Sequence, residues 1–430
     1  MSGRQVFVTG MGIVCPIGHN VEGFTQALGG EASGLAPIAL FDTSEFRVKT
    51  AGEILDLQKL IPSDPIASTM SPETERAAIL GILAGNEALK SAVVGNGREH
   101  WAVVVGTASS EMSALEALYL RSNNSAAWER PVWGLSTPSL LVGKLASKLE
   151  LRGGPTITIA SACSAGTTAI GVAYDLIRNG DVDIALAGGV DPLSESGFAG
   201  FNSVRSLTST RCQPFDRNRD GMFVSEGAAF LVLEERTAAL RRHAPVRAEV
   251  MGHSFSVDAY HVTSPLPDGR GLAQAILGCL DAANLELEEI DYINAHGTGT
   301  AKNDPAELQA ICRAFGDRAR AIPISSIKGA TGHALGACGA IEAIACIVGM
   351  ENDFIPHTVG LDDPIEDFGD LDLVKGNPRH QRVGVAVSLS AAFGGLNAVL
   401  ALRSVSVENS VRLKGTTEAV KPAKDSLQAN

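Results

Sequence analysis

Short apolar runs alternate with longer segments of helical spacing along most of the chain. Val6–Gly12 and Trp101–Gly106 are runs that end in small residues, which predicts buried strands followed by tight turns. Glu73–Ala92 and Val142–Leu149 place Ala, Ile and Leu at helical intervals. Residues 30–72 mix Gly, Pro, Ser and Asp, which predicts loops. Alternating strands and helices indicate an α/β protein whose sheet carries helices on both faces.

One strand-to-helix junction carries a cysteine. The β-branched run Thr156–Ile159 predicts a buried strand, and small residues then lead into a helix that ends near Gly180. Cys163 lies at the corner between them. Free N–H groups and the helix dipole favour a thiolate at such a corner, and small neighbours leave room for a substrate. This placement favours a nucleophile over the ordinary alternative, a cysteine that only packs in the core.

The second half of the sequence repeats features of the first. Three elements recur in one order, and Ile324–Gly332 aligns with Ile159–Gly166. Lys328 then occupies the corner equivalent to that of Cys163, facing it across a pseudo-dyad. We therefore predict a first half over residues 1–250, a second half over 251–404 and a disordered tail over 405–430.

Composition and charge narrow the function classes. The 430 residues are 45% hydrophobic with 46 glycines, as in a tightly packed globular protein. The net charge of −13 and the lack of Lys/Arg runs argue against nucleic acid or a membrane surface as a partner. The seven cysteines are scattered, the sequence after Met1 has no signal-peptide pattern, and no uncharged apolar run reaches about 18 residues. We expect a cytoplasmic protein with reduced thiols.

Two histidines lie in turns rich in glycine and threonine. His296 follows a predicted strand in Asn294–Thr300, and His333 opens a helix in Lys328–Gly339. Ligands of open α/β sheets gather at the carboxyl ends of strands, so both are candidates to act with Cys163. The other seven histidines are read as surface or packing residues. A zinc site would need a fourth ligand or a short-spaced pair, and nucleotide-binding fingerprints are missing, so we predict no metal and no nucleotide.

With these motifs the chain resembles a β-ketoacyl-acyl carrier protein synthase, a condensing enzyme of the thiolase superfamily, over residues 3–403. The resemblance implies a duplicated αβαβα layered fold with two mixed five-stranded sheets. It is closest to the chain-elongating type II group, because two histidines accompany the cysteine. Five motifs carry it: Ser161–Gly166, Pro214–Gly221 with Glu226-Gly-Ala, His296–Thr300, Lys328–His333 and Phe393–Asn397.

The resemblance also implies roles for individual residues. Cys163 accepts an acyl group from a carrier-protein thioester. His296 and His333 donate hydrogen bonds to the enolate oxygen that forms when a malonyl thioester loses CO2. The backbone N–H groups of Cys163 and Phe393 form the oxyanion hole, and a pair formed by Lys328 and Glu342 supports His333. Thr298 and Thr300 either bind the phosphopantetheine arm or only cap backbone groups.

Several positions depart from the usual pattern of this family. Ala391 replaces an aromatic residue beside the gate residue Phe393, which frees volume, and Ala392 replaces a glycine, which restricts backbone motion. Met222 stands where Phe is usual, the connection Ser206–Gln213 is short, and Ser109 replaces a bulky apolar residue of the acyl pocket. These features resemble nodulation-type and polyene-type condensing enzymes and predict unusual acyl selectivity.

The sequence therefore predicts an elongating ketosynthase of specialised acyl or polyketide synthesis. Its substrates would be carried on the phosphopantetheine of an acyl carrier protein, with no further cofactor. It would act as a homodimer or as the ketosynthase half of a heterodimer with a homologous chain-length subunit. A non-catalytic interaction subunit and a thiolase acting on CoA esters are the alternatives.

Overall fold

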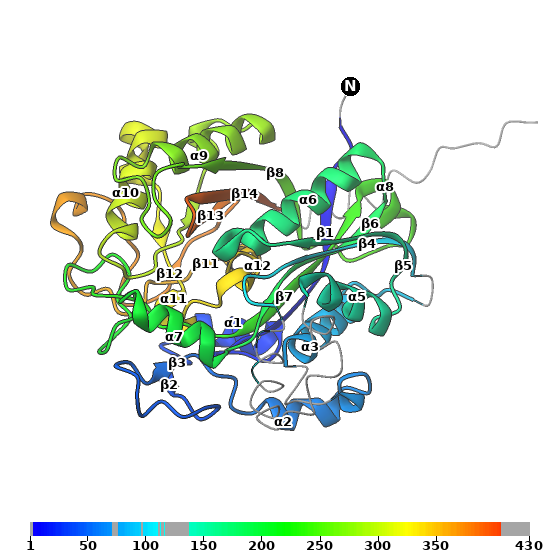
Figure 1. The fold of residues 1–430 in the computed structure, drawn as a ribbon. Helices are drawn as coiled ribbons and strands as arrows, with labels where there is room; N and C mark the ends of the chain where they lie inside the picture. The colour runs from blue at the N-terminus through cyan, green and yellow to red at the C-terminus, as the bar shows by residue number, and fades with distance from the viewer. Residues whose placement is uncertain are drawn as a thin grey trace, which may run out of the picture.

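A single mixed sheet organises the part of the chain that the structure describes. This computed structural model describes residues 3–70, 76–95, 98–110, 112, 116 and 137–405. Ten strands of these residues form the sheet, in the order β10-β9-β13-β14-β8-β1-β7-β6-β4-β5 (Figure 1). Their bounds are β1 Val6–Val14, β4 Glu99–Gly106, β5 Arg152–Ile159, β6 Ile184–Asp191, β7 Gly227–Glu235, β8 Ala248–Val257, β9 Tyr292–Asn294, β10 Ile324–Ser325, β13 Val385–Ala392 and β14 Leu396–Ser404.

The sheet consists of two halves with the same topology. In the first half β1 and β6 run antiparallel to β7, and β4 runs parallel to both β6 and β5. In the second half β8 and β13 run antiparallel to β14, and β9 runs parallel to both β13 and β10. The halves join where β1 pairs with β8, at Val6↔Val250 through Val8↔Ala248. The predicted pair of five-stranded sheets is thus continuous at this seam, and the boundary predicted at residue 250 falls inside β8.

Helices form three layers around the two half-sheets. Two of them, α6 and α12, share one core with residues from both halves, and α12 is buried on nearly every side. Helices α3 and α5 pack on the outer face of the first half, and α9 and α10 on the outer face of the second. Residues alternate between cores along a strand: Val103 faces α3 and α5, whereas Ala102 and Val104 face α6. The result is the predicted αβαβα layering.

Further helices and four short strands complete the fold of the described residues. The helices are α1 Val21–Leu28, α2 Leu57–Leu60, α3 Arg76–Ser91, α5 Pro138–Lys148, α6 Ala165–Asn179, α7 Glu195–Ser203, α8 Arg236–Arg241, α9 Arg270–Ala283, α10 Asn303–Phe315, α11 Lys328–Thr331 and α12 Cys338–Glu351. Short strands β2 Ala36–Pro37 and β3 Thr50–Ala51 form one hairpin-like pair, and β11 Phe354–Ile355 and β12 Arg379–His380 form another.

Four sequence predictions differ from the structure or extend beyond the described residues. The segment 30–72, predicted as loops, contains α2 and the β2–β3 pair. The strand ending at Ile159 exists, but it is the edge strand β5, and Thr156 is exposed rather than buried. A β-branched run fits a pleated surface whether or not a neighbour covers it, so the pattern alone does not separate edge from centre. The start of the predicted helix 73–92 and the tail after residue 405 lie outside the described residues.

Candidate active site

Cys163 is mounted at the corner between β5 and α6. A short 3-10 turn, Ala162–Ser164, joins the two elements, and Ala162 adopts a left-handed backbone (φ 49°) that a non-glycine residue rarely takes. A hydrogen bond from the Ser164 hydroxyl to the Ser161 carbonyl, at 2.8 Å, stabilises the turn. The cysteine side chain is 6% exposed and lines a pocket. The predicted corner is confirmed, and it aims the sulfur into a cavity.

The protonation state of this thiol differs from the sequence expectation. Burial raises the pKa of Cys163 to about 11, although the Phe393 N–H and the Lys328 charge both act to lower it. The free protein therefore holds Cys163 as a thiol at neutral pH. The expectation of a thiolate was wrong because the sulfur has lost its water, and the N–H groups at the corner do not replace it.

Two buried carboxylates of α10 hold the loop that carries His296. The Glu307 carboxylate accepts the N–H groups of His296 and Gly297, at 2.6 and 2.8 Å. Asp304 accepts the N–H groups of Thr298 and Gly299, both at 3.1 Å. Burial raises the pKa of Glu307 to about 7. Sequence reasoning missed both carboxylates, although acidic residues at a helix start directly after Gly-Thr-Gly-Thr were an available signal.

Lys328 is fully buried behind His296. Its ammonium donates to the His296 carbonyl at 2.6 Å, lies 3.2 Å from Nδ1 of the same residue and pairs with Glu342. Burial opposes the charge of Lys328 most strongly, but Glu342, Cys338 and Glu307 together outweigh it, so the net pKa of Lys328 is raised. All three ammonium protons have acceptors. The predicted Lys328–Glu342 pair is present; its ammonium bonds directly to His296, and its charge also acts on His333.

His333 is held by backbone groups. Its backbone N–H donates to the Phe223 carbonyl at 2.8 Å, and its ring Nδ1 accepts the Leu335 backbone N–H at 3.1 Å. Burial lowers the pKa of His333 to about 3, and the Lys328 charge adds to the effect. Burial and Lys328 also lower the pKa of His296 well below its ordinary value. Both rings are therefore neutral at physiological pH.

The partners of the two rings fix their tautomers. An ammonium and a backbone amide are donors only, so Nδ1 of His296 and Nδ1 of His333 act as acceptors and carry no proton. The proton of each neutral ring then resides on Nε2. The rings meet edge to face with centroids 5.3 Å apart. The site thus holds two converging N–H donors rather than two bases.

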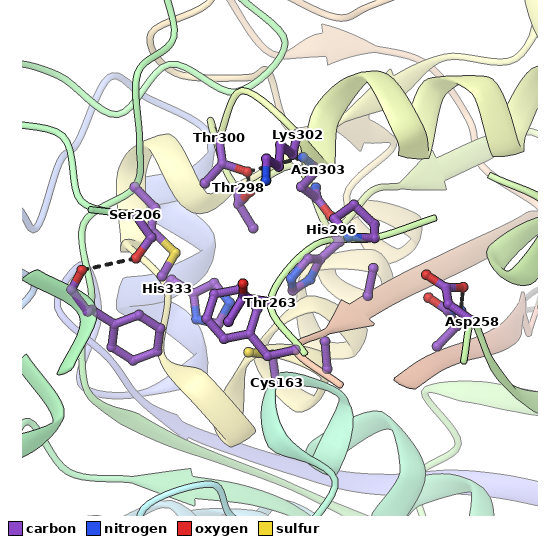
Figure 2. Close-up of a pocket in the computed structure, with 17 residues that line it drawn as sticks. Cys163, Ser206, Asp258, Thr263, His296, Thr298, Thr300, Lys302, Asn303 and His333 are labelled. Carbon is purple, nitrogen blue, oxygen red and sulfur yellow. Dashed lines mark hydrogen bonds between the residues drawn. The ribbon is translucent and has the colours of Figure 1, made fainter. Parts of the chain in front are cut away.

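Cys163, His296 and His333 line the same pocket, of about 60 Å³ (Figure 2). The three come from segments far apart along the chain and surround one space in the close-up. This is the convergence that the sequence predicted. Phe393 also lines the pocket, and its ring packs on Phe201 of α7 with centroids 5.9 Å apart.

Most of the other residues predicted to bind substrate line this pocket, but Ser109 does not. Thr298, Thr300 and Ala391 line the pocket. The two threonine hydroxyls bond to one another at 3.0 Å, and Thr300 also accepts the Asn303 N–H, so lining and capping occur together. Met222, noted as a departure, lines the pocket as well. Ser109 is not among the described lining residues, and its hydroxyl donates to buried Asp191 at 2.8 Å.

The described residues contain neither a candidate metal site nor a candidate membrane span. No group of three His, Cys, Asp or Glu side chains there is arranged to hold a metal ion. None of the helices in that part of the chain is both long and apolar enough to cross a membrane.

Known proteins match this chain over nearly all its length. The family described as "Beta-ketoacyl synthase, N-terminal domain" matches residues 3–239, and "Beta-ketoacyl synthase, C-terminal domain" matches residues 247–362. A "3-oxoacyl-[acyl-carrier-protein] synthase 2" from Synechocystis is 34% identical, covering 93% of this chain and 98% of that protein. "Nodulation protein E" from Rhizobium meliloti is 35% identical, with 94% and 100% covered. The solved "ishigamide ketosynthase/chain length factor" superposes with a TM-score of 0.87 at 36% identity, with 94% and 100% covered. The chain therefore belongs to the β-ketoacyl synthase family of condensing acyltransferases, with the thiolase-like fold.

Proposed function

We propose that the protein is a 3-oxoacyl-[acyl carrier protein] synthase that condenses an acyl group held on Cys163 with a malonyl group held on an acyl carrier protein. One observation carries the proposal. A buried thiol shares its pocket with two neutral imidazoles whose Nδ1 partners leave Nε2 as the proton-bearing nitrogen. Such donors suit a reaction in which negative charge develops on an oxygen only at the transition state.

The first step is acyl transfer to the sulfur. A bond forms between Cys163 Sγ and the acyl carbon, the bond to the phosphopantetheine sulfur breaks, and the thiol proton ends on the released phosphopantetheine thiol. No proton is gained or lost overall, and one thioester replaces another. The Phe393 N–H that faces the sulfur, with the Cys163 N–H, receives the oxyanion of the tetrahedral intermediate.

The second step is decarboxylation and condensation. The bond between C2 of the malonyl group and its carboxylate breaks, CO2 leaves, and the electron pair forms an enolate whose oxygen accepts from His296 and His333. C2 then attacks the acyl carbonyl on Cys163, and the sulfur leaves with its electron pair and is protonated from solvent. Loss of CO2 supplies the carbanion, so no side chain has to act as a base. Lys328 acts through His296, whose Nδ1 it keeps occupied.

The chemistry requires phosphopantetheine-bound substrates and no other cofactor. Ala391, Ala392 and Met222, which differ from the usual pattern, line the same pocket as the sulfur. Together with the likeness to a nodulation protein and to a ketosynthase with a chain length factor, they support a role in specialised acyl or polyketide synthesis. A non-catalytic interaction subunit would have no need of this assembled set of thiol, imidazoles and buried ion pair.

Intact-mass measurement tests this function. The protein is incubated with an acyl-carrier protein, and then a malonyl-carrier protein is added. We expect an acyl adduct that disappears after the second addition, and no adduct on C163A. H333A should still load the acyl group but release little CO2. Acylation that persists in C163A would overturn the assignment of the nucleophile, and turnover without malonate would favour a thiolase.

We further propose that the protein works as a dimer, with itself or with a homologous chain-length subunit, assembled through β5. This edge strand has a paired neighbour, β4, on one side only among the described residues, and its Thr156 and Pro155 are exposed. An open edge of this length is normally covered. Native mass spectrometry, with and without a co-expressed homologous chain, distinguishes the two assemblies, and a monomer in both samples would exclude them.

A further inference from the structure

The buried thiol of Cys338 lies against the second catalytic imidazole and has no place in the steps above. Cys338 is the first residue of α12 and follows His333 by five positions. Its sulfur is 3.6 Å from His333 Nδ1, within hydrogen-bonding distance for sulfur. The same Nδ1 accepts the Leu335 N–H at 3.1 Å. Two donors from one turn therefore converge on one ring nitrogen.

The direction of the sulfur contact follows from the protonation states. His333 Nδ1 carries no proton, because the Leu335 amide already donates to it. Cys338 is 3% exposed, and burial raises the pKa of its thiol well above the ordinary value, although the Lys328 charge opposes this. The thiol keeps its proton and is the donor. The titratable groups near this pair are the ion pair of Lys328 and Glu342, the Cys163 thiol and the His296 ring.

The backbone around Cys338 holds the sulfur in place. Leu335 has a left-handed backbone (φ 50°), and the Gly336 N–H donates to buried Asp191 at 2.6 Å. Gly339 packs so closely on α6 that an added Cβ would meet the Thr167 hydroxyl at 1.9 Å. The backbone on both sides of Cys338 is therefore closely held, and the sulfur position depends on a single side-chain torsion.

We propose that Cys338 is a positioning residue for His333: its S–H, together with the Leu335 N–H, keeps Nδ1 an acceptor and so keeps the proton on Nε2, which serves the enolate. The inference rests on the proposed function for its kinetic consequence, but not for the tautomer itself. The two imidazoles are then held in the same tautomer by different partners. A buried ammonium fixes His296, whereas a thiol and an amide, both uncharged, fix His333.

Three variants of helix α12 test the assignment. Cys338→Ala removes the donor, Cys338→Ser replaces it with a hydroxyl donor, and Cys346→Ala is a matched control because it removes a buried thiol from the same helix away from His333. Acyl loading on Cys163 and CO2 release from malonyl-carrier protein are measured for each. We expect Cys338→Ala to slow CO2 release about tenfold, as for the loss of one hydrogen bond, while loading changes by less than about twofold. Cys338→Ser should recover most of the rate, and the control should retain it.

The tautomer is read without substrate. Nitrogen-15 spectra of histidine-labelled protein, with the His333 signals identified from H333N, should show an unprotonated Nδ1 in the parent and a shifted Nδ1 signal in Cys338→Ala, because one of its two donors is lost. Unchanged spectra in Cys338→Ala, or equal losses of loading and CO2 release, would overturn the proposal. If the parent releases no CO2 but its spectra change as expected in Cys338→Ala, the proposed function fails and the positioning role stands.

Discussion

The two equivalent corners of the duplicated fold carry opposite chemistry. Each follows a strand that runs parallel to its neighbour, β5 beside β4 and β10 beside β9. The first corner holds Cys163, a neutral thiol at the wall of the pocket that is faced by the backbone N–H groups of Phe393 and of Cys163 itself. The second holds Lys328, a buried ammonium with three acceptors. Equivalent positions in the two halves thus present a nucleophile in one and support the His296 imidazole in the other, and burial and local partners decide which.

The largest difference between the corners is expected in stability. Lys328→Met leaves Glu342 either charged without a partner or newly protonated, so we expect a loss of about 3–5 kcal/mol in the free energy of unfolding. C163A removes a neutral group and should cost about 1 kcal/mol or less. Urea unfolding measures both. The double variant Lys328→Met/Glu342→Gln should recover much of the loss, and similar costs for the two single variants would contradict the comparison.

The second difference is in reactivity. Because burial raises the pKa of Cys163 to about 11, its thiolate fraction grows about tenfold per pH unit throughout the neutral range. Alkylation of Cys163 by iodoacetamide, followed by peptide mass analysis, should therefore accelerate about a hundredfold from pH 7 to pH 9. A plateau between pH 7 and 8 would mean that the corner stabilises the thiolate after all.

The sequence predicted that the site residues converge, but it did not predict the hydrogen bonds between them. Repetition and strand-end glycines were sufficient to bring Cys163, His296 and His333 together, because ligand sites of α/β proteins form at strand ends. The hydrogen bonds from Lys328 to His296 were not predicted, although the predicted electrostatic effect of Lys328 on His333 is present. Lys328 and His296 are 32 residues apart, and no sequence periodicity reports which distant loop a buried side chain reaches. Asp304 and Glu307 were missed for a similar reason, because a buried carboxylate bonded to backbone N–H groups looks like a surface helix residue in the sequence.

Acid stability depends in part on the buried neutral ring of His333, alongside Glu307, which is common to the parent and the variant compared below. The pKa of His333 in the folded protein, about 3, is below its ordinary value of 6.5, so the folded state favours the neutral ring. The resulting stability is complete above pH 6.5 and is lost as the pH falls toward 3, at about 1.4 kcal/mol per pH unit. Cys163 and Lys328 do not titrate in this range and contribute no slope. Urea unfolding of the parent and of H333N between pH 6 and pH 4 should show a shallower slope in the variant, and parallel slopes would contradict the buried neutral ring.

The smallest effect is expected where a loop closes over the cysteine corner. Ala392 ends β13 next to Phe393, and the left-handed turn that follows is made by Gly394 and Gly395, with φ of 84° and 72°. Ala392 itself is not in the left-handed region, so Ala392→Gly mainly adds freedom to the unfolded chain and should cost about 0.5–1 kcal/mol in the free energy of unfolding.

The added freedom also reaches the Phe393 N–H that faces the sulfur. It does not reach the Lys328 corner, because the three acceptors of Lys328 belong to His296 and Glu342 and lie outside this loop. Acyl loading by Ala392→Gly should therefore change while CO2 release from malonyl-carrier protein does not, as intact-mass and CO2 measurements on one preparation would show. Equal changes in both rates would mean that the two corners share one closing loop, and the functional division between the halves would then be incomplete.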